Sequence, residues 1–170
     1  DLEGITWTCI TPGNMVKPID LERMRRAGCV AVNFGIESGD PYVLKAIQKG
    51  QKPDDVRAAV KAAKSAGMMT VVNFMFGFPE EDADALRRTQ DLMAELSDNT
   101  DYFNTRGVLV PFPGTQIYDR WADTYDLREW WLDLDRVPLE PDGLEPDVDP
   151  TLDIDFFRYS DDVREQIEAC

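Results

Sequence analysis

Glu37 and Ser38 are the first polar residues that could do chemistry, and they end an apolar run in the sequence GIESG at residues 35–39. A carboxylate here can accept hydrogen bonds from the hydroxyls or the ammonium of a ligand, and the neighbouring glycine allows a close approach to the backbone. The alternative is structural, because such residues often satisfy loop amides or cap the next helix. The residue types leave both interpretations open.

Asn73 and Lys49 are two further polar residues in apolar surroundings. Asn73 interrupts the apolar residues 71–76, and a buried amide needs a hydrogen-bond partner from the protein or from a ligand. A partner within the protein is the simpler expectation. Lys49 follows Glu37 by twelve residues and ends a predicted helix, where its charge also meets the helix dipole favourably. This interaction with the helix dipole is enough to explain a lysine at position 49 without a ligand.

The remaining candidates belong to two turn sequences. Residues 77–79 read GFP, which suits a turn from a strand into a helix, and residues 113–114 read PG, a strong turn signal in any protein. Val110 and Pro111 lie just before the second turn. Ligands of parallel α/β sheets bind at the carboxyl ends of the strands, so these residues become candidates where strands precede them.

The elements that must position these residues alternate between strands and helices. Apolar runs rich in β-branched and aromatic residues predict strands at residues 5–10, 30–36, 69–76 and 102–110. Amphipathic stretches predict helices at residues 20–28, 41–50, 53–66 and 80–98, and a last helix at residues 161–169. Nearly continuous apolar strands linked by helices indicate a parallel sheet that is buried on both faces. The predicted fold class is α/β.

Capping residues set the ends of the first two helices. We expect Asp20 to be the N-cap of the first helix, with Gly28 just past its end. Asp40 is the expected N-cap of the second helix, because Pro41 follows it and proline suits the first helical position.

Four strand-helix repeats in 170 residues cannot close an eight-stranded barrel, which needs about 250 residues. We therefore predict a partial (β/α) barrel with parallel strands at residues 1–124 and an irregular acidic extension at residues 125–170. Trp130 and Trp131 begin the extension's proline-rich part. They either form a lid over a binding site or cover apolar surface.

Composition excludes several classes of function. The 18 basic and 33 acidic residues give a net charge of −15, which repels a nucleic-acid backbone. No apolar run is long enough for a membrane helix. The absence of histidine excludes Ser-His-Asp and Cys-His enzymes. Three cysteines without short spacings indicate a reducing cytoplasm, and the start at Asp1 suggests a piece cut from a longer chain.

Four segments together resemble one family. They read GIESG at residues 35–39, LKAIQKG at residues 44–50, FMFGFPE at residues 74–80 and PGT at residues 113–115. In order and spacing they resemble the later half of the barrel of radical S-adenosylmethionine (radical SAM) enzymes. The likeness is greatest to the subgroup that often carries a cobalamin-binding domain and includes methyltransferases. It covers about residues 4–120.

The resemblance implies a cofactor and a set of contacts to it. In this superfamily a reduced [4Fe-4S] cluster cleaves S-adenosylmethionine to a 5′-deoxyadenosyl radical, and the protein holds the cofactor and excludes competing reactions. Carried over by motif, Glu37 and Ser38 contact the ribose or the methionine moiety. Lys49 approaches the carboxylate of that moiety as a point charge, and Asn73 bonds a ribose hydroxyl.

The adenine contacts implied by the resemblance come from the turn sequences. The backbone at Gly77 lies close to the adenine, and Val110 and Pro111 supply apolar contacts to the base.

The resemblance departs from the family where the cluster should be held. The family's Cys-x-x-x-Cys-x-x-Cys loop is missing, and Cys9 alone cannot replace it. We expect a radical SAM enzyme whose cluster, and cobalamin where it is used, are bound by the remainder of a longer chain, with a small-molecule or peptide substrate. The alternatives are a cluster-free relative that binds a nucleotide-like ligand or a protein, and a hydrolase that uses Glu37 with a second carboxylate. No catalytic residue or metal ligand is assigned.

Overall fold

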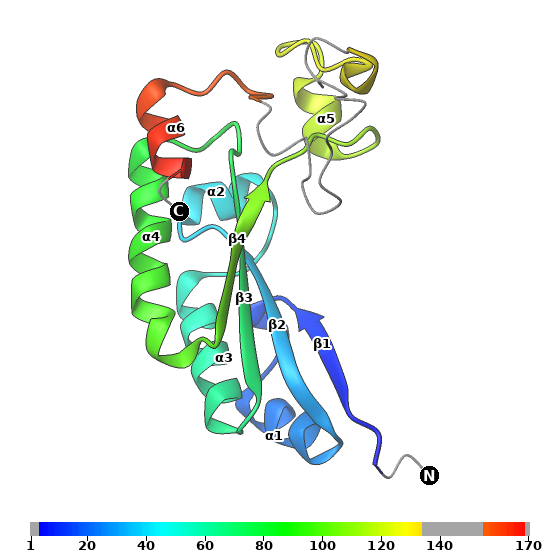
Figure 1. The fold of residues 1–170 in the computed structure, drawn as a ribbon, viewed down its shortest axis with the longest axis vertical. Helices are drawn as coiled ribbons and strands as arrows, with labels where there is room; N and C mark the ends of the chain where they lie inside the picture. The colour runs from blue at the N-terminus through cyan, green and yellow to red at the C-terminus, as the bar shows by residue number, and fades with distance from the viewer. Residues whose placement is uncertain (1–3, 134–154, 169–170) are drawn as a thin grey trace, which may run out of the picture.

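A computed structural model describes residues 4–133 and 155–168 of the chain. Four parallel strands form one sheet in the order in which they occur along the chain (Figure 1). They are β1 (Trp7–Thr11), β2 (Cys29–Glu37), β3 (Met69–Phe76) and β4 (Tyr102–Val108). Among the described residues the four strands form an open sheet and not a closed barrel. This confirms the predicted α/β class and the partial barrel.

Helices connect the strands and continue beyond the last one. The α-helices are α1 (Pro18–Arg26), α2 (Pro41–Ala46), α3 (Pro53–Ser65), α4 (Ala83–Leu96), α5 (Gln116–Trp121) and α6 (Asp161–Glu168). Short 3₁₀ turns occupy Gly13–Met15, Ser97–Asn99 and Trp130–Leu132. The helices α1, α3 and α4 all lie on the same side of the sheet, and α6 lies beside α4 (Figure 1). The segment around α5 lies beyond the carboxyl end of β4.

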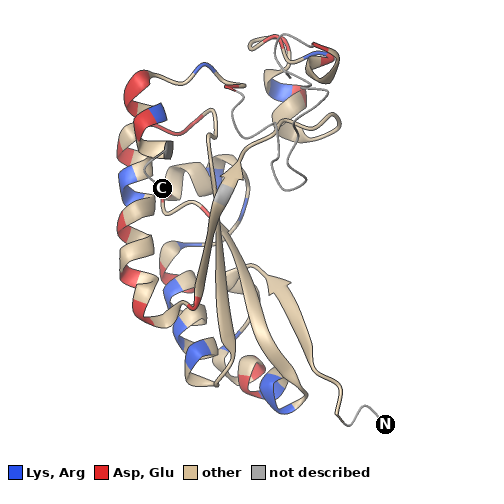
Figure 2. Cartoon of the chain, viewed as in Figure 1, with Lys and Arg blue, Asp and Glu red and all other residues tan. Residues whose placement is uncertain are grey.

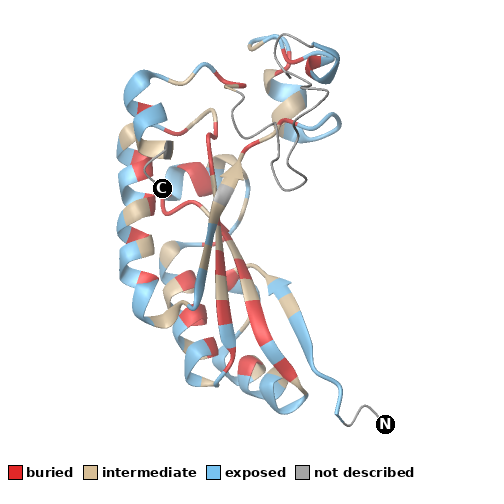
Figure 3. Ribbon diagram, viewed as in Figure 1, coloured by how far each residue is buried: buried red, intermediate tan, exposed pale blue. Residues whose placement is uncertain are grey.

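Alternation along the strands decides which face of the sheet is buried. Val32, Phe34 and Ile36 of β2 are fully buried, whereas the residues between them are only half-buried. The same alternation holds along β3, and Figure 3 shows the buried residues on the strands and on the helix sides that meet them. Each fully buried large apolar side chain contributes about 1.5 to 3 kcal/mol. These residues form the main core.

The expectation of a sheet buried on both faces is wrong for the described residues. Asn33, Gly35 and Glu37 alternate with the core residues of β2 and lie on the face opposite the helices. The strand therefore has the period-two pattern of a sheet with one packed face. Charged side chains are concentrated on the helices and loops, and the strands carry few (Figure 2).

The structure corrects the predicted start of α1 and confirms that of α2. The helix α1 begins at Pro18, not after Asp20: Lys17 is the N-cap, and Asp20 lies at the third helical position, where its carboxylate accepts the Lys17 N–H at 3.2 Å. The proline fixes the start, because its ring suits the first helical turn. Asp40 is confirmed as the N-cap of α2, since its carboxylate accepts the Val43 N–H at 2.8 Å.

Other boundaries shift by a few residues. The helix α2 ends at Ala46, so Lys49 lies in the loop after it and not at the end of a helix. The strand β1 is displaced toward Thr11, and β4 ends at Val108 rather than at residue 110. Asp82 caps α4 by accepting the Ala85 N–H at 2.7 Å, so that helix starts at Ala83 and not near residue 80. The helix α5 was not predicted, whereas the C-terminal helix was.

The domain division at residue 124 stays a prediction. Most of the proline-rich part of the acidic extension lies outside the described residues. In the part of the chain that the structure describes, no helix is long and apolar enough to cross a membrane.

We predict that Gly39→Ala destabilises the fold strongly. A Cβ at Gly39 would lie 2.6 Å from the carbonyl oxygen of Arg88 and 2.7 Å from the Cα of Thr89, so α4 would have to move away. The free energy of unfolding in urea should fall by about 2 kcal/mol or more. Ala58→Gly, on the exposed side of α3, is the control and should cost about 1 kcal/mol. If both substitutions lower the free energy of unfolding equally, the backbone around Gly39 can move to accommodate a Cβ.

Candidate functional site

Glu37 and Lys49 form an ion pair at the carboxyl end of β2. The Glu37 carboxylate oxygen lies 2.5 Å from the Lys49 Nζ, and the two side chains are 19% and 24% exposed. Glu37 has a φ of 69°, in the left-handed region, next to an irregularity in the pairing of β2 with β3. A Cβ at Gly35 would lie 3.1 Å from the Glu37 carboxylate. The glycine therefore leaves room for the pair beside the sheet.

Asn73 lies at the centre of a row of three asparagines that crosses the sheet. Its Nδ2 donates to Asn33 Oδ1 and, at 3.2 Å, to the Phe34 carbonyl. Its Oδ1 accepts from Asn104 Nδ2 at 3.1 Å. Asn73 thus has the protein partners that a half-buried amide requires, and one lone pair of its Oδ1 is left over.

Asn33 and Asn104 were not among the predicted site residues. The rule that singled out Asn73 could have found them, because each also interrupts an apolar strand. Their spacing in the sequence gave no sign that all three meet. The parallel register of β2, β3 and β4 brings them together.

Ser38 is fully buried and bonds to the protein. Its Oγ accepts the Asp40 N–H at 3.1 Å and lies 3.2 Å from Thr89 Oγ1. Asp40 in turn binds Arg88, whose Nε lies 2.5 Å from its carboxylate. This network holds the loop after β2 against α4, as the structural alternative for Ser38 expects. Its contact with a cofactor stays a prediction.

The turn at Gly77 is held from two sides. The Glu81 carboxylate accepts the Gly77 N–H at 2.7 Å and the Phe78 N–H at 3.2 Å. The Tyr159 hydroxyl donates to the Gly77 carbonyl at 2.5 Å. Gly77 has a φ of +80°, and a Cβ there would lie 2.3 Å from the Tyr159 hydroxyl oxygen. Only glycine fits between the turn and the C-terminal segment.

Glu81 is a buried carboxylate that sequence reasoning missed. Its second oxygen, Oε1, finds no hydrogen-bond partner among the described residues. Burial raises the pKa of Glu81 from 4.5 to about 7, and repulsion by Asp40 and Asp82 adds to the rise. The two amide hydrogen bonds oppose it. Burial also raises the pKa of Tyr159, and the charges of Asp155 and Glu81 act in the same direction.

Val110 and Pro111 lie where β4 leads toward α5. The Pro111 carbonyl accepts the indole N–H of Trp130 at 3.1 Å, and Val110 contacts a second apolar cluster that contains Trp130. The Trp130 ring is 6% exposed, and its centroid lies 4.8 Å from that of Phe156. Trp130 therefore covers apolar surface, whereas Trp131 is 42% exposed.

No cluster site is visible in the described residues. Residues 4–133 and 155–168 contain no group of three or more histidine, cysteine, aspartate or glutamate side chains that could hold a metal ion. Cys9 and Cys29 are free thiols, and burial raises the pKa of Cys9. These residues do not fit an iron–sulfur cluster.

Parallel strands in an open sheet, with helices in the connections and an ion pair at the carboxyl end of β2, are the features of a partial (β/α) barrel. The family profile for the radical SAM superfamily matches residues 1–93. The chain belongs to this superfamily, as its four sequence segments indicated.

Methyltransferases are among the curated relatives. An uncharacterized methyltransferase of Pyrococcus horikoshii is 32% identical over 115 residues, which are 68% of this chain and 24% of the relative. The bacteriochlorophyllide d C-12(1)-methyltransferase of Chlorobaculum tepidum is 27% identical over 129 residues, 75% of this chain and 28% of the relative. The chain thus spans about a quarter of the length of these relatives.

Solved structures share the fold. The radical SAM methyltransferase TsrM of Kitasatospora setae, solved with cobalamin and a [4Fe-4S] cluster, has a TM-score of 0.57 at 24% identity, over 68% of this chain and 22% of its own. Elp3 of Methanocaldococcus infernus has a TM-score of 0.60 at 17% identity, over 71% of this chain and 28% of its own. Both support the partial barrel.

We predict that Glu81 makes the protein less stable as the pH rises. Its folded pKa of about 7 exceeds the ordinary 4.5, so the folded state binds the proton more tightly. Stability is therefore lost between pH 4.5 and about 7, by up to about 3 kcal/mol. Glu81→Gln should remove this slope and be more stable than the wild type at pH 8, measured by urea unfolding from pH 5 to pH 8.

Asp84→Asn, an exposed change in the first turn of α4, is the control and should leave the slope unchanged. A Glu81→Gln protein with the wild-type pH dependence would show that Glu81 titrates normally.

Proposed function

We propose that this chain forms the S-adenosylmethionine-binding half of a radical SAM enzyme that transfers a methyl group or performs a related radical reaction. The remainder of a longer chain would supply the cluster ligands. One observation carries the proposal: the Glu37–Lys49 pair lies at the carboxyl end of β2, on the same open face of the sheet as the asparagine row. When bound, S-adenosylmethionine supplies one-electron or methyl-transfer chemistry.

The pair of opposite charges fits the amino-acid end of the cofactor. S-Adenosylmethionine carries an ammonium and a carboxylate on one carbon atom, which match Glu37 and Lys49 respectively. A partly exposed ion pair contributes only about 1 kcal/mol or less. The ion pair can therefore separate at little cost in free energy. Glu37 would then bind the ammonium of the cofactor, and Lys49 its carboxylate.

The asparagine row supplies both donors and acceptors for ribose hydroxyls. Because Asn33 and Asn104 fix the orientation of the Asn73 amide, its remaining lone pair has a defined direction. Preorganised polar groups of this kind bind a hydroxyl without first losing conformational freedom.

The Gly77 turn is suited to close apolar contact rather than to hydrogen bonding. Glu81 occupies the Gly77 N–H and Tyr159 occupies its carbonyl. Tyr159 fills the side of Gly77 where a Cβ would lie, so an adenine at this turn would pack against the other side of the backbone, with Val110 and Pro111 contributing on the side of β4. This supports the roles that the resemblance implied for all three residues.

The deciding experiment is the intact mass and iron content of the natural gene product, purified anaerobically from its source. A mass well above 19.3 kDa with bound iron supports the proposal. A product near 19.3 kDa that takes up no iron would contradict it. Such a product would support the alternative, a cluster-free relative that binds a nucleotide-like ligand or a partner protein.

We further predict that Lys49→Ala weakens S-adenosylmethionine binding by about 10- to 100-fold, because hydrogen bonds to charged groups contribute about 1.5 to 3 kcal/mol. The affinity would be measured by equilibrium dialysis with the reconstituted full-length protein. Lys61→Ala, an exposed lysine of α3, removes the same charge elsewhere and should bind normally. Unchanged affinity in the Lys49→Ala protein, with normal iron content, would exclude Lys49 from the site.

A further inference from the structure

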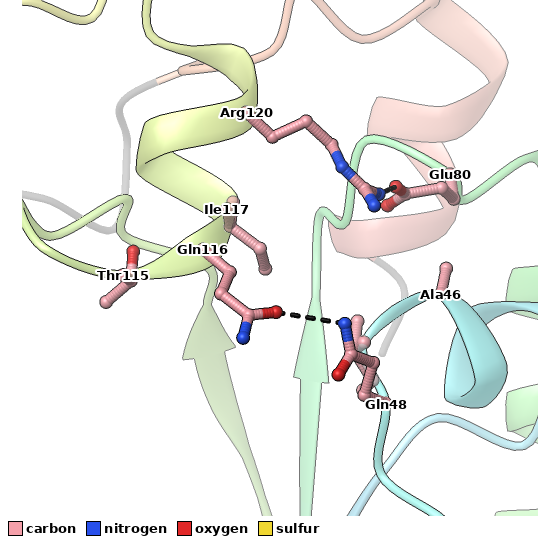
Figure 4. Close-up of a pocket in the computed structure, with 8 residues that line it drawn as sticks. Ala46, Gln48, Glu80, Thr115, Gln116, Ile117 and Arg120 are labelled. Carbon is pink, nitrogen blue, oxygen red and sulfur yellow. Dashed lines mark hydrogen bonds and ion pairs between the residues drawn. The ribbon is translucent and has the colours of Figure 1, made fainter.

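A cavity of about 300 Å³ lies between the end of α2, the loop after β3 and the start of α5. Figure 4 shows Gln48 and Gln116 facing each other across it, with Glu80 and Arg120 paired nearby. We propose that this cavity binds an uncharged carboxamide attached to an apolar group, such as a peptide bond beside an aliphatic side chain. The inference rests on the proposed function, because it makes the carboxamide part of the enzyme's substrate.

The two glutamines determine the hydrogen bonding in the cavity. Gln48 Nε2 donates to Gln116 Oε1 at 3.0 Å. That bond leaves the Gln48 oxygen as an acceptor and the Gln116 amino group as a donor, side by side. A carboxamide presents an N–H donor beside a carbonyl acceptor and is therefore complementary to both. An ester or a carboxylate lacks the donor.

The charges in the cavity favour a neutral ligand. The Arg120 guanidinium lies 3.3 Å from the Glu80 carboxylate, so the pair has no net charge. A phosphate or a carboxylate would face Glu80, whose side chain is only 13% exposed and cannot easily turn away. A free amino acid would have to separate the pair to bind its two charges. A carboxamide leaves the pair intact.

The walls and the position of the cavity suit a substrate. Ile47 and Ile117 add apolar surface beside the glutamines, which fits an aliphatic group next to the carboxamide. Gln48 directly precedes Lys49, and the cavity is built from the loops that follow three neighbouring strands. A ligand held here would lie beside the proposed cofactor site.

The test uses the full-length protein, reconstituted anaerobically, and three matched probes: 3-methylbutanamide, 3-methylbutanoate and methyl 3-methylbutanoate, with leucine as the zwitterion. Binding constants would come from ligand-observed NMR titrations. We expect the amide to bind at least threefold more tightly than each of the other probes, because a neutral hydrogen bond contributes about 0.5 to 1.5 kcal/mol. Equal or tighter binding of the ester, the carboxylate or leucine would overturn the inference.

Gln48→Gly is the sharpest variant for this test. Gln48 has a φ of 56°, a conformation that glycine adopts without strain, so the substitution removes the amide and should not lower the melting temperature. The amide probe should bind about 3- to 10-fold more weakly. Gln116→Ala, which removes the partner amide from an exposed position, should have the same effect. Lys45→Ala, on the exposed side of α2, should not.

Iron content and S-adenosylmethionine affinity would be measured on the same samples. If both are normal while the two glutamine variants bind the amide as the wild type does, the carboxamide site is refuted and the proposed function stands. If the protein takes up no iron, the proposed function is refuted, and with it the substrate role of the cavity.

Discussion

The burial of one face of the sheet is the constraint on which the other features depend. Because α1, α3 and α4 cover the same face, the apolar residues of β2 and β3 must point toward them at every second position. The residues between them are forced onto the open face, where Asn33, Asn73 and Glu37 lie. The parallel direction of the strands then brings all of their carboxyl ends to one edge. The candidate site is thus a consequence of the packing on the other side of the sheet.

Local sequence signals were sufficient for the fold class and most of the elements. Long apolar runs and proline-marked helix starts act over a few residues, so they can be read from the chain directly. The predicted helix boundaries were wrong where one residue can serve two different local structures. Asp20 can cap a helix or accept an amide bond at its third position, and Pro18 decides between them. The short α5 escaped prediction because it packs against an apolar cluster that includes distant residues such as Phe156, and it has no strong pattern of its own.

The sequence predicted individual residues of the candidate site but not the contacts between them. Glu37 and Lys49 each had an adequate structural explanation, and only the fold shows that they form one ion pair. Tyr159 lies 82 residues after Gly77, and no pattern in the chain links the two. Glu81 follows the turn that it holds, so its proximity could be read from the sequence. Its burial and its raised pKa could not, because they depend on α2, α4 and the C-terminal segment together.

Rigidity at this edge of the sheet has a cost that the surrounding contacts must offset. Glu37 and Gln48 have left-handed backbone conformations, which are unfavourable for residues with side chains, and Glu81 keeps a buried oxygen without a partner among the described residues. Such features persist only where neighbouring interactions enforce them. At Glu81 the two hydrogen bonds from the Gly77 and Phe78 amides do so, and they fix the loop that leaves β3. Strain concentrated at the carboxyl ends of β2 and β3 is expected of a surface that is shaped before its ligand arrives.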